Sequence, residues 1–389
     1  MSTQYQKKLS HLSQEQIERL IQRYYDGEKN DLLIKEYNID IRTGLLVKTF
    51  PMLTHDDILC PYCDIPMVSY RESKSSYTFG NPKAFCQKCK HKNYDPYCNC
   101  ENCKKLRENQ AEILRQKEAK LNNAKRQILI ESYEYENSMP ISIDELTVKD
   151  KLYICALLRT SLSEDFQNIN PLSSVKSNLA PTQQYKINII SYLRNKLIVL
   201  FSPSTSLHSI VIENNEIQSY YPLDVTLKLN AAEKQYDEVV QNLLHLDIDD
   251  EINNETKLEL WYEIGLFECL EFLYAKMDEY NLPSEHVGDK TISAIKESLK
   301  DFSISQNFNF IWRAVTNAAA FYQKSSVSKK HAVNTISGSI IRSHEKAKAE
   351  NWEIKGYGRD YNYPQSVISE VFFNNILKIG DKGFESKIS

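Results

Sequence analysis

Apolar positions near the N-terminus recur with the spacing of one helix face. They lie three or four residues apart, at Ile17, Leu20, Ile21 and Tyr24. Ser13 and Gln16, just before them, fit a capping box. Gly27 fits the end of a helix. The pattern therefore predicts a helix that ends near Gly27.

Two further short helices are predicted before Pro51. One runs from Asp31 to Tyr37, and the other, capped by Asp40, runs from Ile41 to about Thr49. Three short helices with a tight turn before the last are typical of a helix-turn-helix, whose last helix enters the major groove of DNA. The side chains expected to reach DNA are Arg42, Thr43 and Lys48. A protein-interaction module is the alternative for the same three helices.

The middle of the chain combines helical and strand patterns. Amphipathic segments at 149–160 and 181–195 precede strand-like segments at 197–201, 208–212 and 216–221, and a turn is predicted at Asn214 and Asn215 between the last two. Two β-rich segments after helices predict a winged-helix-like α+β unit. Because this part carries a net negative charge, protein contact remains an alternative to DNA contact.

The C-terminal part reads as mainly helical. Apolar stripes predict buried helices over 258–280 and 305–322, followed by a helix over 329–349 and a last one from Pro364 to near Gly380. This end is basic and contains tyrosines whose rings can stack on bases. Nucleic-acid contact is therefore an alternative to solvated helix faces.

Polar residues dominate a long segment that contains no Gly or Pro, from Lys104 to about Tyr133. This composition predicts a long, mostly solvated helix. Leu114, Leu121 and Ile128 lie seven residues apart, which is the spacing at which helices pair in a coiled coil. A homodimer through this helix is therefore one expectation, and a monomer is the alternative.

Seven of the nine cysteines lie between Cys60 and Cys103. Dense clustering of thiols in a reducing compartment indicates metal binding rather than disulfides. Two C-x2-C pairs separated by 22 residues are formed by Cys60, Cys63, Cys86 and Cys89. Such pairs are typical of a zinc ribbon with a closed, structural Zn²⁺ site. Strands at 67–70 and 76–79, joined by a turn at 80–82, are expected between the two pairs.

A second cysteine group follows nine residues later, at Cys98, Cys100 and Cys103. Three thiolates need a fourth ligand, and His91 is the nearest candidate. One or two structural zinc ions are therefore expected. The alternatives are that one of these sulfurs joins the first site or stays free, and that His91 contacts phosphate. Cys155 and Cys269 have apolar helical surroundings and are expected to be core residues.

Charge is segregated along the chain. Residues 83–126 carry 12 Lys and Arg against 5 Asp and Glu, whereas residues 233–301 carry 6 against 18. The basic N-terminal part is expected to meet a polyanion, with backbone contacts from Lys83, Lys88, Lys90 and Lys92.

Several function classes are disfavoured by the sequence. No Gly occurs between Gly80 and Gly265, and neither of the common phosphate-binding glycine motifs is present, so no nucleotide cofactor is expected. Apolar runs are too short for a membrane span, and the first eight residues lack a signal-peptide pattern, which predicts a cytoplasmic protein.

One pattern leaves a nuclease open as an alternative. Glu353 and Lys355, in a strand-like segment at 352–357, have the E-x-K spacing of metal-dependent nucleases.

The order of three helices, Pro51 and two C-x2-C pairs resembles the N-terminal region of bacterial transposases and mobile-element regulators. The resemblance covers about residues 10–105 and implies binding of double-stranded DNA. We expect a mainly α, multidomain, zinc-stabilised DNA-binding protein that acts as a transcriptional regulator or mobile-element-associated protein rather than as an enzyme. A ribbon-based protein–protein adaptor and a metal-dependent nuclease are the alternatives. The predicted parts are a helix-turn-helix (1–55), a zinc ribbon (56–105), a helical linker (106–138), a winged-helix-like unit (139–230) and a helical C-terminal domain (231–389).

Overall fold

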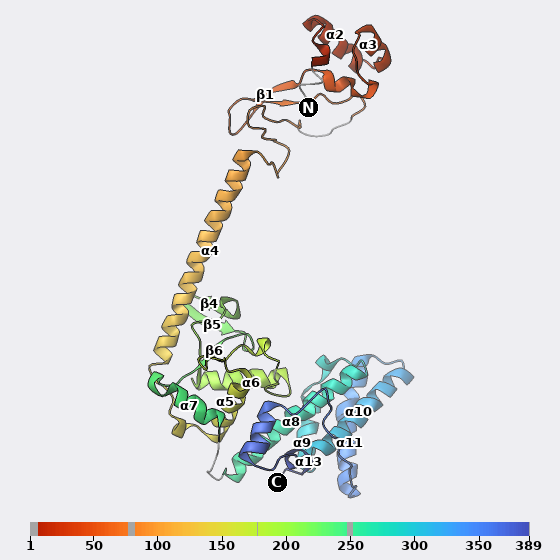
Figure 1. The fold of residues 1–389 in the computed structure, drawn as a ribbon. Helices are drawn as coiled ribbons and strands as arrows, with labels where there is room; N and C mark the ends of the chain where they lie inside the picture. The colour runs from red at the N-terminus through yellow and green to blue at the C-terminus, as the bar shows by residue number, and fades with distance from the viewer. Residues whose placement is uncertain (1–6, 77–81, 177, 247–251, 389) are drawn as a thin grey trace. The chain divides into compact units, whose positions relative to one another are not determined.

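The chain forms two compact units in the computed structural model, Met1–Lys120 and Leu121–Ser389 (Figure 1). The structure describes residues 7–76, 82–176, 178–246 and 252–388. Helices dominate both the secondary structure and the core of the described residues, which confirms the mainly α prediction. The boundary between the units falls within the long helix α4 (Glu101–Glu136). Among the described residues, no helix has the length and apolarity needed to cross a membrane.

The first unit begins with the short 3-10 helix η1 (Lys7–Leu9), followed by α2 (Gln14–Tyr25) and α3 (Asn30–Glu36). The predicted capping box is present, because Ser13 accepts from the Gln16 N–H and Gln16 accepts from the Ser13 N–H. Helix α2 ends where Gly27 takes a φ of +96°, which lets the Glu28 N–H donate to the Arg23 carbonyl at 3.2 Å.

The third predicted helix differs from the expectation. It is a 3-10 helix, η2 (Thr43–Thr49), and it begins two residues later than expected. Asp40 does not cap it, because its carboxylate pairs with the Lys8 ammonium at 2.8 Å. Fully buried Leu46 anchors η2 in a small core shared with α2 and α3. The segment is thus fixed by packing rather than by a local cap.

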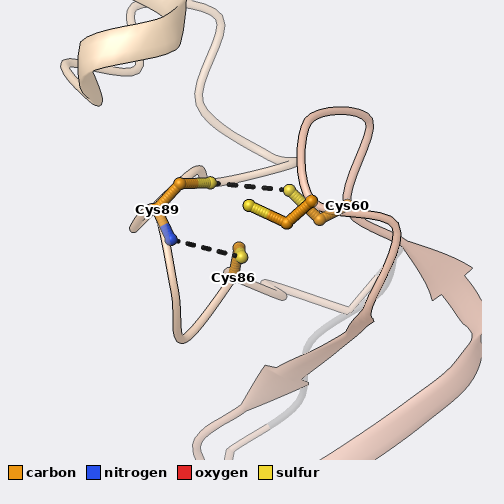
Figure 2. Close-up of side chains that lie close together, drawn as sticks. Cys60, Cys86 and Cys89 are labelled. Atoms are coloured by element: carbon orange, nitrogen blue, oxygen red, sulfur yellow. Dashed lines mark hydrogen bonds between the residues drawn. The ribbon is translucent and has the colours of Figure 1, made fainter.

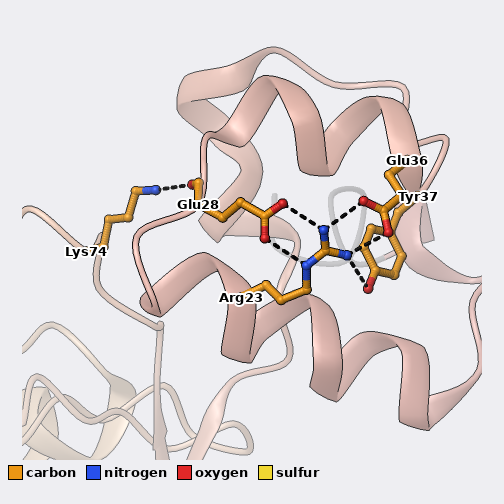
Figure 3. A network of polar contacts seen from close by, with 5 residues as sticks. All are labelled: Arg23, Glu28, Glu36, Tyr37 and Lys74. Atoms are coloured by element: carbon orange, nitrogen blue, oxygen red, sulfur yellow. Dashed lines mark hydrogen bonds and ion pairs between the residues drawn. The ribbon is translucent and has the colours of Figure 1, made fainter.

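A polar network connects the ends of α2 and α3 (Figure 3). The Arg23 guanidinium donates to Glu28 at 2.7 and 2.8 Å and to Glu36 at 2.6 and 2.8 Å. The Lys74 ammonium donates to the carbonyl of Glu28, which links the helices to the chain after β2. Bidentate pairing of this kind holds two helices at a defined angle.

Strand β1 (Leu53–Leu59) pairs antiparallel with β2 (Pro66–Ser69), with Thr54 opposite Val68. The sequence did not indicate β1, which pairs with the strand predicted at 67–70. Most of the other predicted strand, 76–79, and of the turn at 80–82 lies in 77–81, outside the described residues. Phe85 continues the ladder by bridging Val68 on one side and Lys92 on the other.

The second unit holds one main hydrophobic core, to which residues from 129 to 388 contribute. Its first part contains α5 (Val148–Ser161) and α6 (Gln183–Asn195), and two antiparallel pairs of strands. The strands are β3 (Val199–Phe201) with β6 (Leu227–Leu229), and β4 (Ile210–Glu213) with β5 (Glu216–Tyr220). Asn214 and Asn215 both have positive φ, as a tight turn between β4 and β5 requires.

The second part of this unit is helical. The three long helices predicted here are present as α8 (Asn254–Glu279), α10 (Ile304–Lys324) and α11 (Lys329–Ala349). Two shorter helices, α7 (Tyr236–Leu244) and α9 (Asp289–Leu299), were not predicted. Helix α10 packs against α8 and α11. Short 3-10 turns lie at 143–145, 172–174, 207–209, 233–235 and 284–286.

The end of the chain differs from the single last helix that was predicted. It divides into α12 (Val367–Glu370), a π-helical segment η8 (Val371–Ile376) and α13 (Lys382–Glu385). Gly380 has a φ of +55°, which turns the chain back. A Cβ at Gly383 would lie 2.1 Å from the Phe373 ring, so the close packing of these two residues requires glycine. The predicted strand at 352–357 has no regular structure.

Candidate metal centres

The first C-x2-C pair forms the loop between β1 and β2. The Cys60 N–H donates to the Ile65 carbonyl at 2.9 Å, and the Asp64 N–H donates back to the Cys60 carbonyl at 3.0 Å. Asp64 closes the loop with a φ of +50°. This tight reversal turns both sulfurs toward the same point.

The second pair repeats this geometry. The Cys86 N–H donates to the His91 carbonyl at 2.7 Å, and the Lys90 N–H donates to the Cys86 carbonyl at 3.0 Å. Lys90 takes the position of Asp64, with a φ of +62°. Two loops with the same backbone hydrogen bonds, joined by the Val68–Phe85 bridge, therefore present their sulfurs to one another.

The four sulfurs of Cys60, Cys63, Cys86 and Cys89 all lie within 4.8 Å of one another. Figure 2 shows Cys89 opposite Cys60, with sulfurs 3.5 Å apart, and the Cys89 N–H directed at the Cys86 sulfur at 3.4 Å. A closed set of four thiols at this separation can hold a metal ion and leaves no position for a substrate.

A second group of four donors consists of His91, Cys98, Cys100 and Cys103, whose ligand atoms also lie within 4.8 Å of one another. His91 Nδ1 lies 3.2 Å from the Cys103 sulfur and 3.9 Å from the Cys100 sulfur. The structure thus brings His91 to the three cysteines, as the spacing predicted. This group can also hold a metal ion.

The second group lies at the start of α4. Cys100 immediately precedes the helix, and its sulfur accepts from the Cys103 N–H in the first turn at 3.4 Å. The Lys92 N–H donates to the Cys98 sulfur at 3.3 Å. Backbone N–H groups at a helix start favour thiolates over thiols. A metal ion held here would fix the first turn of α4.

The thiols differ in acidity. Burial disfavours the Cys86 thiolate, but N–H groups of Cys89 and Lys88 and the neighbouring sulfurs bring the pKa of Cys86 down to about 7. Burial raises the pKa of Cys89 to about 12 and that of Cys100 to about 11. Binding of a metal ion by these groups therefore requires the release of protons.

Tyr62 was not singled out by sequence reasoning, yet it touches the second group. Its hydroxyl lies 3.2 Å from the Cys103 sulfur. This hydrogen bond, with burial, raises the pKa of Tyr62 to about 12. The only sequence signal was an aromatic residue inside the Cys60–Cys63 loop, which by itself does not reveal a contact 41 residues away.

The side chains predicted to contact DNA are all exposed. They are Arg42, Thr43, Lys48, Lys83, Lys88, Lys90 and Lys92. Arg42 and Thr43 lie at the start of η2, and Lys48 lies near its end. Lys88 and Lys90 lie on the Cys86–Cys89 loop, and Lys92 is 3.8 Å from the Asp95 carboxylate.

The remaining sequence candidates have structural surroundings. Cys155 and Cys269 are fully buried, as predicted, and burial raises the pKa of both thiols. Glu353 and Lys355 are exposed in an irregular segment. Within the described residues, the two cysteine groups are the only clusters suited to a metal ion, and Glu353 belongs to neither.

In comparisons with protein-family models, with curated proteins and with solved structures, no match to this chain was found. The resemblance to transposase N-terminal regions therefore remains a prediction from the sequence.

Proposed function

We propose that this chain is a zinc-stabilised protein that binds double-stranded DNA through its first unit, and that it acts as a regulator or a mobile-element-associated protein. The helix-turn-helix would supply base contacts through η2, and the second metal-binding loop would supply phosphate contacts. One observation carries the proposal. Four exposed lysines, Lys83, Lys88, Lys90 and Lys92, lie in the same short stretch of chain as the ligands of the two candidate metal sites.

The donor chemistry favours zinc over other metals. Sulfur-rich tetrahedral sets suit Zn²⁺, and a full set of four protein ligands is typical of a structural ion. Each ion would supply folding energy, since thiolates gathered this closely repel one another without a cation. The ions would thus hold the loops that carry Lys88 and Lys90.

The polyanion preference follows from charge and exposure. Lys83, Lys88, Lys90 and Lys92 lie within ten residues of one another, and all four are exposed. Neutralising phosphates with such side chains releases counterions, so binding weakens steeply with salt. Arg42 lies immediately before η2, and the guanidinium of an arginine can donate two hydrogen bonds to the edge of guanine.

The test is fluorescence anisotropy of the purified, zinc-loaded full chain with random-sequence duplex DNA at 50 and 200 mM salt. We expect the dissociation constant to rise at least tenfold over this range. Lys88→Ala and Lys90→Ala should each weaken binding and reduce the salt slope by about one. Lys290→Ala, an exposed lysine of the acidic stretch, is the matched control. Salt-independent binding, or none, would refute the proposal.

An adaptor function is the second candidate. It is favoured by exposed apolar side chains on the first unit, since Leu32 is 55% exposed and Leu59 is 50% exposed. An adaptor would keep its protein partner bound at high salt. The Leu32→Glu variant would lose that partner, whereas Lys88→Ala would keep it. DNA binding by the native chain and partner binding by these two variants therefore separate the two functions.

We also propose that α4 pairs with the α4 of a second copy. Leu114 is 60% exposed and Leu121 is 56% exposed, and the two lie on one stripe of the helix. A two-fold pair would present two DNA-reading units, as many helix-turn-helix proteins do.

A further inference from the structure

One side chain of the first metal-binding loop reaches into the second donor group. Tyr62 lies between Cys60 and Cys63, and its hydroxyl is 3.2 Å from the Cys103 sulfur. Its ring also meets the His91 ring edge-on, with the centroids 5.1 Å apart and the planes at 87°. Tyr62 therefore contacts two of the four donors of the second group.

His91 makes a second connection in the opposite direction. Its carbonyl accepts from the Cys86 N–H at 2.7 Å, which completes the second loop of the first group. Its Nδ1 faces the Cys103 sulfur of the second group at 3.2 Å. The same residue thus belongs to the backbone of one site and to the ligands of the other.

We propose that Tyr62 is a positioning residue that couples the two metal sites, so that an ion in the first group favours an ion in the second. An ion bound by Cys60 and Cys63 holds the loop that carries Tyr62, and the Tyr62 hydroxyl then donates to the Cys103 thiolate. This inference rests on the proposed role of both groups as metal sites, and it does not depend on DNA binding.

The physical basis is the hydrogen bond from an outer residue to a ligand. Such a donor fixes the orientation of the ligand and disperses its charge, and its loss typically lowers metal affinity by about 10–100-fold. Cys103 also faces the His91 ring, so its sulfur is held from two sides when Tyr62 is in place. Because coupling is reciprocal, an ion in the second group must favour the first by the same factor.

The two ions can be followed separately with Co²⁺ in the metal-free full chain, kept reduced. A four-sulfur site and a three-sulfur, one-nitrogen site differ in their ligand-field bands, and both show thiolate charge-transfer bands. For Tyr62→Phe we expect the affinity of the Cys₃His site for Co²⁺ to fall about tenfold once the four-sulfur site is filled. The affinity of the four-sulfur site, measured while the Cys₃His site is empty, should change less than twofold, because coupling acts only when the other ion is bound. The thiolate band of the Cys₃His site should also shift in energy, because the Cys103 sulfur loses its donor.

Tyr97→Phe is the matched control, because Tyr97 also lies in the cysteine-rich part of the chain but is 80% exposed. It should leave both affinities and both spectra unchanged. A merely structural role of Tyr62 would weaken both sites and leave the band position unmoved, which would overturn the proposal. It would also be overturned if Tyr62→Phe bound both ions as the native chain does, or if the native chain took up one Co²⁺ only. Loss of DNA binding with these spectra intact would instead refute the proposed function alone.

Discussion

Nη1 of Arg359 lies 2.8 Å from Oε1 of Glu268, and the Glu268 side chain is only 2% exposed. The guanidinium also lies over the Phe384 ring, 4.2 Å from its centroid. Arg359 thus brings its charge from an irregular segment into the core around α8. A buried carboxylate requires such a partner, since an isolated buried charge is very costly.

Arg359→Met should therefore destabilise the second unit. The methionine keeps most of the apolar volume but leaves the Glu268 charge without its partner, and we expect a loss of about 3 kcal/mol. Urea unfolding followed by circular dichroism measures it. Arg313→Met, at an exposed position of α10, is the control and should cost less than about 0.5 kcal/mol. Equal effects of the two variants would contradict the role of the ion pair.

Glu271, one turn along α8 from Glu268, gives the second unit an unusual dependence on pH. Burial and the negative charge of Glu268 raise the pKa of Glu271 to about 7, against opposing effects of Asn178, Lys186 and Arg359. The folded state therefore holds this proton more tightly than the unfolded state does. Its contribution to stability is full below the unfolded pKa of 4.5 and is lost as pH rises through about 7.

We accordingly expect the free energy of unfolding to fall by about 1–2 kcal/mol between pH 5 and pH 7.5, allowing for the partial exposure of the side chain. Glu271→Gln mimics the protonated form and should flatten this part of the profile. Urea titrations at a series of pH values test this. An identical slope in the variant and the native chain would show that another group is responsible.

The elements predicted correctly from the sequence are those fixed by neighbouring residues. The capping box of Ser13 and Gln16 and the turn at Asn214 depend on contacts within a few positions. The cysteine groups were predictable for the same reason, because each C-x2-C loop is closed by its own backbone hydrogen bonds.

The elements missed depend on distant residues. Strand β1 contains Asp56 and Asp57 and shows little apolar alternation, so only its pairing with β2 reveals it. The last predicted helix is interrupted, and the chain turns back so that Phe373 packs on Gly383. Likewise the contact of Tyr62 with Cys103 exists only because the fold brings the two cysteine groups together.

Self-association through α4 can be tested on its exposed stripe. Leu114→Glu and Leu121→Glu together should convert a dimer to a monomer, because both charges would face the partner helix. Sedimentation velocity at several protein concentrations measures this. Asn123→Glu adds a charge at another exposed position of α4 and should leave the dimer intact. A native chain that sediments as a monomer at all concentrations would refute the pairing.

The two donor groups also predict the metal content of the protein. Elemental analysis of the native chain, purified without chelators, should find about two zinc ions per chain. Cys63→Ser and Cys98→Ser remove one ligand from different groups, and each should lower the content by about one. Cys269→Ala removes a buried thiol far along the sequence from both groups and should leave the zinc content unchanged.

Structural zinc also predicts the effect of a chelator. Because each ion would hold loops that have few apolar contacts of their own, a strong chelator should unfold the cysteine-rich segment, seen as loss of amide protection between 53 and 105. Full protection of this segment in a chain without zinc, whether purified so or stripped by the chelator, would refute structural zinc.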